Sequence, residues 1–105
     1  MEHLQFDNDI IASIGKIEPE RSLDRSILRL LEKETIKRIT KYQIMIHSLE
    51  KKYGMTFEKF EMRIKESKPE YTVEQDYYDW DLAITAKEDM EIDLEKVRIR
   101  LEKNN

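Results

Sequence analysis

The carboxylates of this 105-residue chain are the side chains whose spacing comes closest to a catalytic or metal-binding pattern. Glu88, Glu91 and Glu95 stand three and four residues apart, so one face of a helix would carry all three, as in the interior of a metal-binding helical bundle. A di-metal bundle also needs Glu-x-x-His pairs on two helices, whereas "HSLE" at residues 47–50 has the reverse order. A carboxylate metalloenzyme is therefore the least favoured hypothesis.

The remaining candidates for catalysis are isolated. His3 lies in a segment that we expect to be irregular, and His47 stands in mid-helix beside an apolar position. The chain has no phosphate-binding glycine loop, no HExxH and no cysteine, so it offers neither a thiolate metal site nor a disulfide. The sequence predicts a protein that is not an enzyme and that needs no metal or cofactor.

The segment "DYYDWD", residues 76–81, alternates aromatic and acidic side chains. On a helix that turns about 100° per residue, Tyr77 and Trp80 share the face of Val73, which is typical of core residues. Tyr78 points nearly opposite, where an aromatic side chain has no core role but could anchor a partner protein. Asp76 and Asp81 flank the aromatic face and Asp79 points away from it. The candidate partner-binding residues are Tyr78, Asp76, Asp79, Asp81, Tyr77 and Trp80.

Charge is segregated along the chain in a way that the net charge of −4 does not reveal. Residues 70–95 contain ten acids and one base, whereas residues 20–68 contain thirteen bases and eight acids. Five bases at steps of four form a predicted basic ridge, expected on the face away from the core: Arg25, Arg29, Lys33, Lys37 and Lys41. Five acids recur at every seventh position of the last helix and form an acid row: Glu74, Asp81, Glu88, Glu95 and Glu102.

The basic ridge is a candidate site for nucleic acid or for an acidic partner protein. A nucleic-acid module usually has overall basicity and a recognisable motif, and a chain with a pI near 5.3 has neither. We therefore do not expect this chain to bind nucleic acid alone, and the alternative interpretation is that both charged rows are solvated faces.

The elements that must position these residues follow from the breaks at Pro19, Gly54 and Pro69. A long helix is predicted from the N-cap Ser22 to residue 53, where Gly54 can take the left-handed conformation that ends a helix. A short helix capped by Thr56 is predicted to end near residue 67. A second long helix follows to residue 103, with Thr72 and Gln75 as a capping box.

The fold class predicted is all-α, an antiparallel hairpin of two long helices with a short helix at the turn. One domain is expected over residues 1–105, with residues 1–18 irregular or ordered by a partner. Two helices cover each other's apolar stripes on one side only, so association into a homo-oligomer is predicted to complete a helical bundle. No stretch is long and apolar enough to span a membrane, and we expect a cytoplasmic protein without a membrane partner.

One resemblance rests on residues 50–66, "EKKYGMTFEKFEMRIKE", and residues 73–85, "VEQDYYDWDLAIT". The pattern is similar to that of small helical antitoxin-like proteins of prokaryotic toxin–antitoxin modules, including partners of TumE-type toxins. This resemblance implies a non-catalytic protein that binds and neutralises a cognate toxin. The residues it carries over are Tyr53, Gly54, Phe57, Phe60, Tyr77, Trp80, Asp76, Asp79 and Asp81. The alternative function is a self-associating helical scaffold or adaptor.

Overall fold

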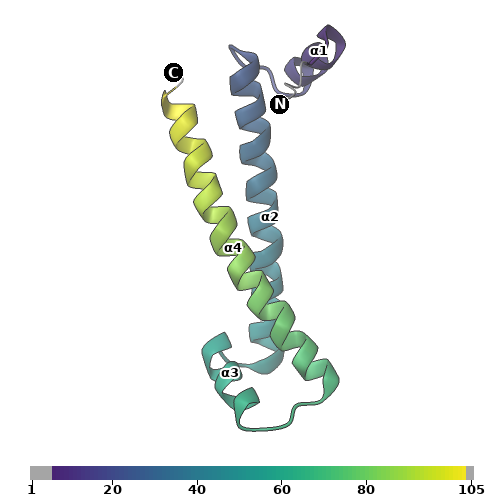
Figure 1. Cartoon of the computed structure of the whole chain (residues 1–105), viewed down its shortest axis with the longest axis vertical. Helices are drawn as coiled ribbons and strands as arrows, with labels where there is room; N and C mark the ends of the chain where they lie inside the picture. The colour runs from purple at the N-terminus through teal and green to yellow at the C-terminus, as the bar shows by residue number, and fades with distance from the viewer. Residues whose placement is uncertain (1–5, 104–105) are drawn as a thin grey trace, which may run out of the picture.

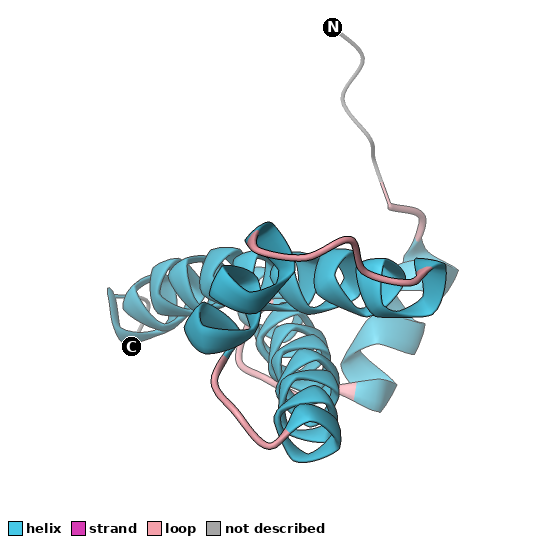
Figure 2. Cartoon of the chain, turned by 90° about the horizontal axis from the view of Figure 1, so that it is seen from below, coloured by secondary structure: helices cyan, strands magenta, loops and turns pink. Residues whose placement is uncertain are grey.

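The computed structural model describes residues 6–103 as four helices and the turns that connect them (Figure 1). The helices are α1 (Asn8–Ile17), α2 (Leu23–Tyr53), α3 (Phe57–Lys65) and α4 (Tyr71–Lys103). Helices α2 and α4 pack against each other as an antiparallel hairpin, and α3 lies at the end where the chain turns back. Seen from that end, the two long helices cross obliquely (Figure 2). The all-α hairpin is therefore confirmed.

Local sequence sets both ends of α2 and the start of α3. Ser22 accepts a hydrogen bond from the Arg25 amide at 3.2 Å, and the Thr56 hydroxyl accepts one from the Lys59 amide at 3.4 Å. Gly54 ends α2 with φ of 66°, a conformation in which a Cβ atom would clash with the following carbonyl oxygen. These caps lie where the sequence predicts them.

The start of α4 differs from the prediction. The helix already includes Tyr71, and the Glu74 amide donates to the Glu70 carbonyl at 3.0 Å, so the first helical hydrogen bond comes two residues earlier than in a helix capped by Thr72. The Gln75 side chain donates instead to Asp79 at 3.2 Å, so the capping box does not form. The backbone before the helix supplies the first acceptor, and the Thr72 hydroxyl is not needed for that role.

The N-terminal segment also differs from the prediction, because residues 8–17 form α1 where an irregular stretch was expected over residues 1–18. Asp7 caps α1 by accepting a hydrogen bond from the Ile10 amide at 2.9 Å. The helix contacts the start of α2, where the buried Ser26 hydroxyl donates to the Glu18 carbonyl at 2.7 Å. His3 lies outside the described residues.

The main core lies at the turn end of the hairpin and is aromatic. Trp80 is fully buried, and its ring centroid lies 5.2 Å from that of Phe60 and 5.4 Å from that of Phe57. The Tyr53 ring packs on Phe60 at 4.3 Å. The structure thus joins α2, α3 and α4 through the aromatic side chains that the sequence assigns to this end.

The other half of the hairpin is thin. Val97 and Leu101 of α4 are buried, but Leu31 on the facing part of α2 is 48 % exposed. A hollow of about 450 Å³ between the two helices, the interhelix hollow, is lined by Leu31, Glu34, Thr35, Arg38, Met90, Asp93, Lys96 and Val97. No helix within residues 6–103 has the length and apolar character needed to cross a membrane. The pair of long helices therefore leaves part of its apolar stripe open to solvent.

Candidate functional site

Tyr77 and Trp80 stabilise the fold through contacts with α3. Tyr77 stacks on Phe57 with centroids 5.5 Å apart, and its hydroxyl donates to Glu61 of α3 at 2.6 Å. This hydrogen bond to a carboxylate, aided by burial, raises the pKa of Tyr77 to about 12. Trp80 is wholly enclosed and presents no surface to a partner. Both residues hold α3 against α4.

Asp76 is the electrostatic link between α2 and α4. Its Oδ2 accepts hydrogen bonds from the Lys52 ammonium at 2.6 Å and from the Tyr53 hydroxyl at 2.5 Å. The hydrogen bond from Lys52, followed by that from Tyr53, holds the pKa of Asp76 below its usual value. Burial, followed by the hydrogen bond to Asp76, raises the pKa of Tyr53. Asp76 is thus engaged within the chain.

Among the three aromatic side chains of residues 76–81, Tyr78 is the one that remains accessible. It is 56 % exposed, and its ring meets the Tyr77 ring edge-on with centroids 5.5 Å apart and an interplanar angle of 66°. Asp81, three residues further on, is exposed and forms no ion pair within residues 6–103. The two side chains are neighbours on the helix and form an accessible aromatic–acidic pair.

Asp79 is placed differently from the prediction that it points away. It lies on the wall of a shallow hollow of about 260 Å³ whose other lining residues, Ile44, Met45, Ser48 and Leu49, come from α2. The oblique crossing of the helices brings this part of α4 over α2, which the helical wheel of α4 alone does not reveal. Asp79 is therefore half-covered and less available to a partner than Asp81.

The predicted basic ridge does not form on one face, and this corrects the sequence interpretation. Arg25 is buried beside the end of α4, where it donates to the Leu101 carbonyl at 2.8 Å, whereas Lys37 and Lys41 are exposed. Steps of four residues turn the helix by about 400°, so each successive base is displaced by roughly 40°. The five bases therefore wind around α2 from the α4 side to the solvent side.

Three of these five bases are engaged by acids that the sequence reasoning did not consider. Arg29 contacts Glu20 at 3.0 Å and Glu32 at 2.9 Å, and Lys33 contacts Glu18. Hydrogen bonding to Arg29 is the main cause that lowers the pKa of Glu20. Arg25 also approaches Glu20 at 3.6 Å. These pairs fasten the α1–α2 connection to α2.

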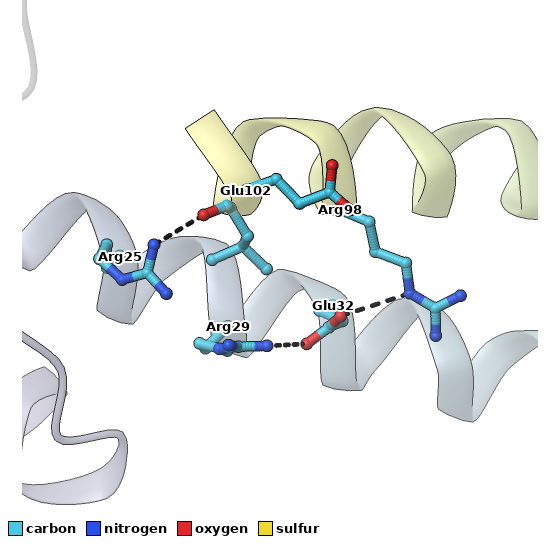
Figure 3. A pocket seen from close by; sticks show the side chains of 6 residues that line it. Arg25, Arg29, Glu32, Arg98 and Glu102 are labelled. Carbon is cyan, nitrogen blue, oxygen red and sulfur yellow. Dashed lines mark hydrogen bonds and ion pairs between the residues drawn. The ribbon is translucent and has the colours of Figure 1, made fainter. Parts of the chain in front are cut away.

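A hollow of about 230 Å³ opens between these arginines and the end of α4 (Figure 3). Glu32 is at its centre, because Arg29 donates to one of its oxygens and Arg98 of α4 to the other at 3.4 Å. Glu102 also lines the hollow. The cationic groups thus already have acceptors in the chain, and the cluster joins α2 to α4.

The three glutamates that could line a metal-binding interior lie at the surface. Glu88, Glu91 and Glu95 are all exposed, and Glu91 accepts a hydrogen bond from Lys87 at 2.8 Å. Within residues 6–103, no three histidine, cysteine, aspartate or glutamate side chains are grouped so that they could hold a metal ion.

An exposed apolar row on α4 was missed by the sequence reasoning, although its signal is present. Beside the acid row, four exposed large side chains follow a seven-residue spacing: Tyr71, Tyr78, Ile92 and Ile99. Thr85 occupies the remaining position of this spacing. Only Tyr78 was recognised as lying opposite the core. The heptad spacing would have identified the others.

Comparison of the chain with protein-family models, with curated proteins and with solved structures finds no match. The function of the chain must therefore be inferred from its own residues and surfaces.

Proposed function

We propose that the chain is a non-catalytic, antitoxin-like module that binds and neutralises a basic toxin protein in the cytoplasm. The observation that carries the proposal is the accessible pair of Tyr78 and Asp81 on α4. Neither side chain is used in the core, and both lie within one helical turn of the fully buried Trp80. The resemblance of residues 50–66 and 73–85 to antitoxin-like proteins supports the same function.

Tyr78 is suited to act as an anchor. Tyrosine is enriched among the residues that dominate binding energy at protein interfaces, because it offers a large amphipathic area at a small entropic cost. The edge contact with Tyr77 restrains the Tyr78 ring before any partner arrives. A restrained ring loses less freedom on binding, which increases affinity.

The charge of α4 favours a basic partner. Of the ten acids in residues 70–95, only Asp76 and Glu91 form ion pairs within residues 6–103. The other eight carboxylates leave a negative potential along residues 70–95. Such a potential accelerates encounter with a positively charged protein and disfavours acidic competitors.

The experiment pairs this chain with the proteins encoded by its neighbouring reading frames. Each neighbour is expressed alone in a bacterial host and then together with this chain, and growth is followed. A toxin partner is expected to arrest growth alone and to be neutralised by co-expression. The complex is then purified, and its dissociation constant is measured by calorimetry.

The variants test the surface. Tyr78→Ala is expected to weaken binding by about 1 kcal/mol or more, which is about fivefold or more in the dissociation constant. Asp81→Lys is expected to slow association and to flatten its salt dependence. Met62→Ala, on an equally exposed apolar residue of α3, is the matched control. The proposal is wrong if no neighbouring protein is neutralised, or if both surface variants bind like the parent.

A second candidate function, a self-associating scaffold, is favoured by the interhelix hollow. Its rim contains two acids and two bases, Glu34, Arg38, Asp93 and Lys96, around an apolar floor. A rim with both signs of charge is compatible with the same surface on a second copy. Self-association at this surface would leave the outer side of α4 free.

A further inference from the structure

The outer side of α4 presents an apolar stripe that no part of the described chain covers. We name as the outer stripe the exposed residues Tyr71, Tyr78, Leu82, Ile92 and Ile99. Their exposed fractions are 78 %, 56 %, 64 %, 56 % and 39 %. Tyr71, Tyr78, Ile92 and Ile99 are spaced by multiples of seven residues, and Thr85 occupies the position between Tyr78 and Ile92. Contiguous exposed apolar surface marks interaction sites on proteins, and the neighbouring Tyr78 and Leu82 give the stripe this character.

The register of the outer stripe is that of a helix-binding face. Positions seven residues apart drift by only about 20° per heptad on a straight helix, so a second helix can follow them with a slight supercoil. From Tyr71 to Ile99 the stripe extends for about 42 Å at 1.5 Å per residue. Leu82 widens it beside Tyr78, whereas Asp89 and Lys96 interrupt it further along. The apolar surface is therefore widest around Tyr78.

The acid row runs along one edge of this stripe. Each member follows a heptad position of the stripe by three residues, as Asp81 follows Tyr78 and Glu95 follows Ile92. All five acids are exposed, and none forms an ion pair within residues 6–103. A partner lying on the stripe would therefore meet a line of carboxylates without ion pairs, of which Glu102 lies beside arginines of the chain.

This charge pattern argues against a second copy as the occupant. In an antiparallel pair of α4 helices, the acid row of one copy would face the acid row of the other. In a parallel pair, the acid row of one copy would face the other edge of the stripe on the second copy. That edge carries Asp79, Asp93 and only one base, Arg100. Like charges in such positions are destabilising, so both arrangements are disfavoured.

We infer that the outer stripe of α4 is the docking surface for an amphipathic helix of the partner protein. The apolar side of that helix packs on Tyr78, Leu82 and Ile92, and lysines or arginines along one of its edges pair with the acid row. This inference rests on the proposed function, since it assigns the site and the chemistry of the partner. It differs from the hairpin's own packing, which uses the opposite side of α4.

The probe is a synthetic helical peptide of about four heptads with isoleucine and leucine on one face and lysines along both edges. A second peptide has the same apolar face and glutamates in place of the lysines. Each is fluorescently labelled, kept dilute and titrated with the full chain while anisotropy is measured. The basic peptide is expected to bind at least about tenfold more tightly than the acidic one.

Two pairs of variants test the surface. Leu82→Ser with Ile92→Ser is expected to weaken binding of the basic peptide by about tenfold or more, whereas Ile44→Ser with Met62→Ser, of similar exposure on α2 and α3, is expected to leave it unchanged. Asp81→Lys with Glu88→Lys is expected to reverse the preference in favour of the acidic peptide. As a control, Glu58→Lys in α3 with Glu66→Lys directly after α3 changes the net charge equally and is expected to retain the preference for the basic peptide.

The inference is overturned if the stripe variants and their controls bind the basic peptide alike, or if reversing the acids leaves the preference unchanged. It is also overturned if Leu82→Ser with Ile92→Ser abolishes self-association, because a second copy then occupies the stripe. A neighbouring toxin that binds the stripe variants like the parent would refute this site while the proposed function stands. Stripe-dependent binding of the basic peptide without any toxin among the neighbours would refute the proposed function alone.

Discussion

Trp80 provides the sharpest test of the packing, because it is the only tryptophan and is fully buried. Its indole contacts the rings of Tyr53, Phe57 and Phe60, which come from α2 and α3. Truncation of a buried tryptophan to alanine typically costs about 3–5 kcal/mol. A domain of this size has a free energy of unfolding of about 5–15 kcal/mol, so Trp80→Ala removes a large share of the stability.

Trp80→Phe is expected to behave very differently. The Trp80 Nε1 group is buried and has no hydrogen-bond acceptor within residues 6–103. Leaving such a donor unsatisfied costs about 1–3 kcal/mol, and phenylalanine removes that cost. The smaller ring loses packing of about 1–2 kcal/mol. The two effects nearly cancel, so the expected change is within about 1 kcal/mol of zero.

The assay is urea unfolding followed by far-ultraviolet circular dichroism, at one fixed protein concentration because association would add to the apparent stability. With a slope of about 2 kcal/mol per molar urea, Trp80→Ala should lower the midpoint by roughly 2 M. Trp80→Phe should shift it by less than about 0.5 M. Equal loss in both variants would refute the reasoning about the unpaired indole. A loss below about 1 kcal/mol in Trp80→Ala would refute the assigned core.

Three further predictions concern the hairpin. Asp76→Asn is expected to destabilise the fold by about 1–3 kcal/mol at pH 7 in urea titrations, because Lys52 and Tyr53 lose a charged acceptor. The pKa of Asp76 is lowered in the folded state, so its carboxylate stabilises the fold above the unfolded-state pKa of about 3.9, and this stabilisation is lost as the pH falls through the lower folded-state pKa. The parent should therefore lose stability below pH about 4, and Asp76→Asn should lack this loss. Gly54→Ala is expected to cost about 1–2 kcal/mol in the same assay, because alanine disfavours a φ of 66°, whereas Gly15→Ala in α1, with no atom near its new methyl group, should not destabilise. Light scattering at micromolar concentration is expected to give at least twice the chain mass of 12.8 kDa, because the interhelix hollow leaves the apolar stripe half-covered, and a value near 12.8 kDa would contradict this.

The helices and the aromatic core could be predicted because their signals are local. Ser22, Thr56 and Gly54 mark helix ends through hydrogen bonds and backbone angles that involve only a few neighbouring residues. The face shared by Tyr77 and Trp80 follows from the helical period alone. The candidate anchor Tyr78 could be recognised by the same reasoning, since it lies opposite that face.

Two of the wrong predictions concern residues whose role depends on other parts of the chain. Arg25 was assigned to an exposed ridge, but its partner is the Leu101 carbonyl, 76 residues away. Asp79 is predicted to point away, but it is half-covered and lines a hollow with residues of α2. Helix α1 had a local signal in the cap Asp7 and in isoleucines at 10, 14 and 17, which was not used.

The sequence by itself determined the lengths of the long helices, their caps and the angular position of each side chain on its own helix, because these depend on interactions within about one turn. Only the tertiary structure decided which charges remain free. Asp76 is neutralised by Lys52 across the hairpin, whereas the neighbouring Asp81 forms no ion pair within residues 6–103. That difference depends on where the second helix crosses the first, and the crossing is set by how the aromatic side chains of α2, α3 and α4 fill the turn end of the hairpin.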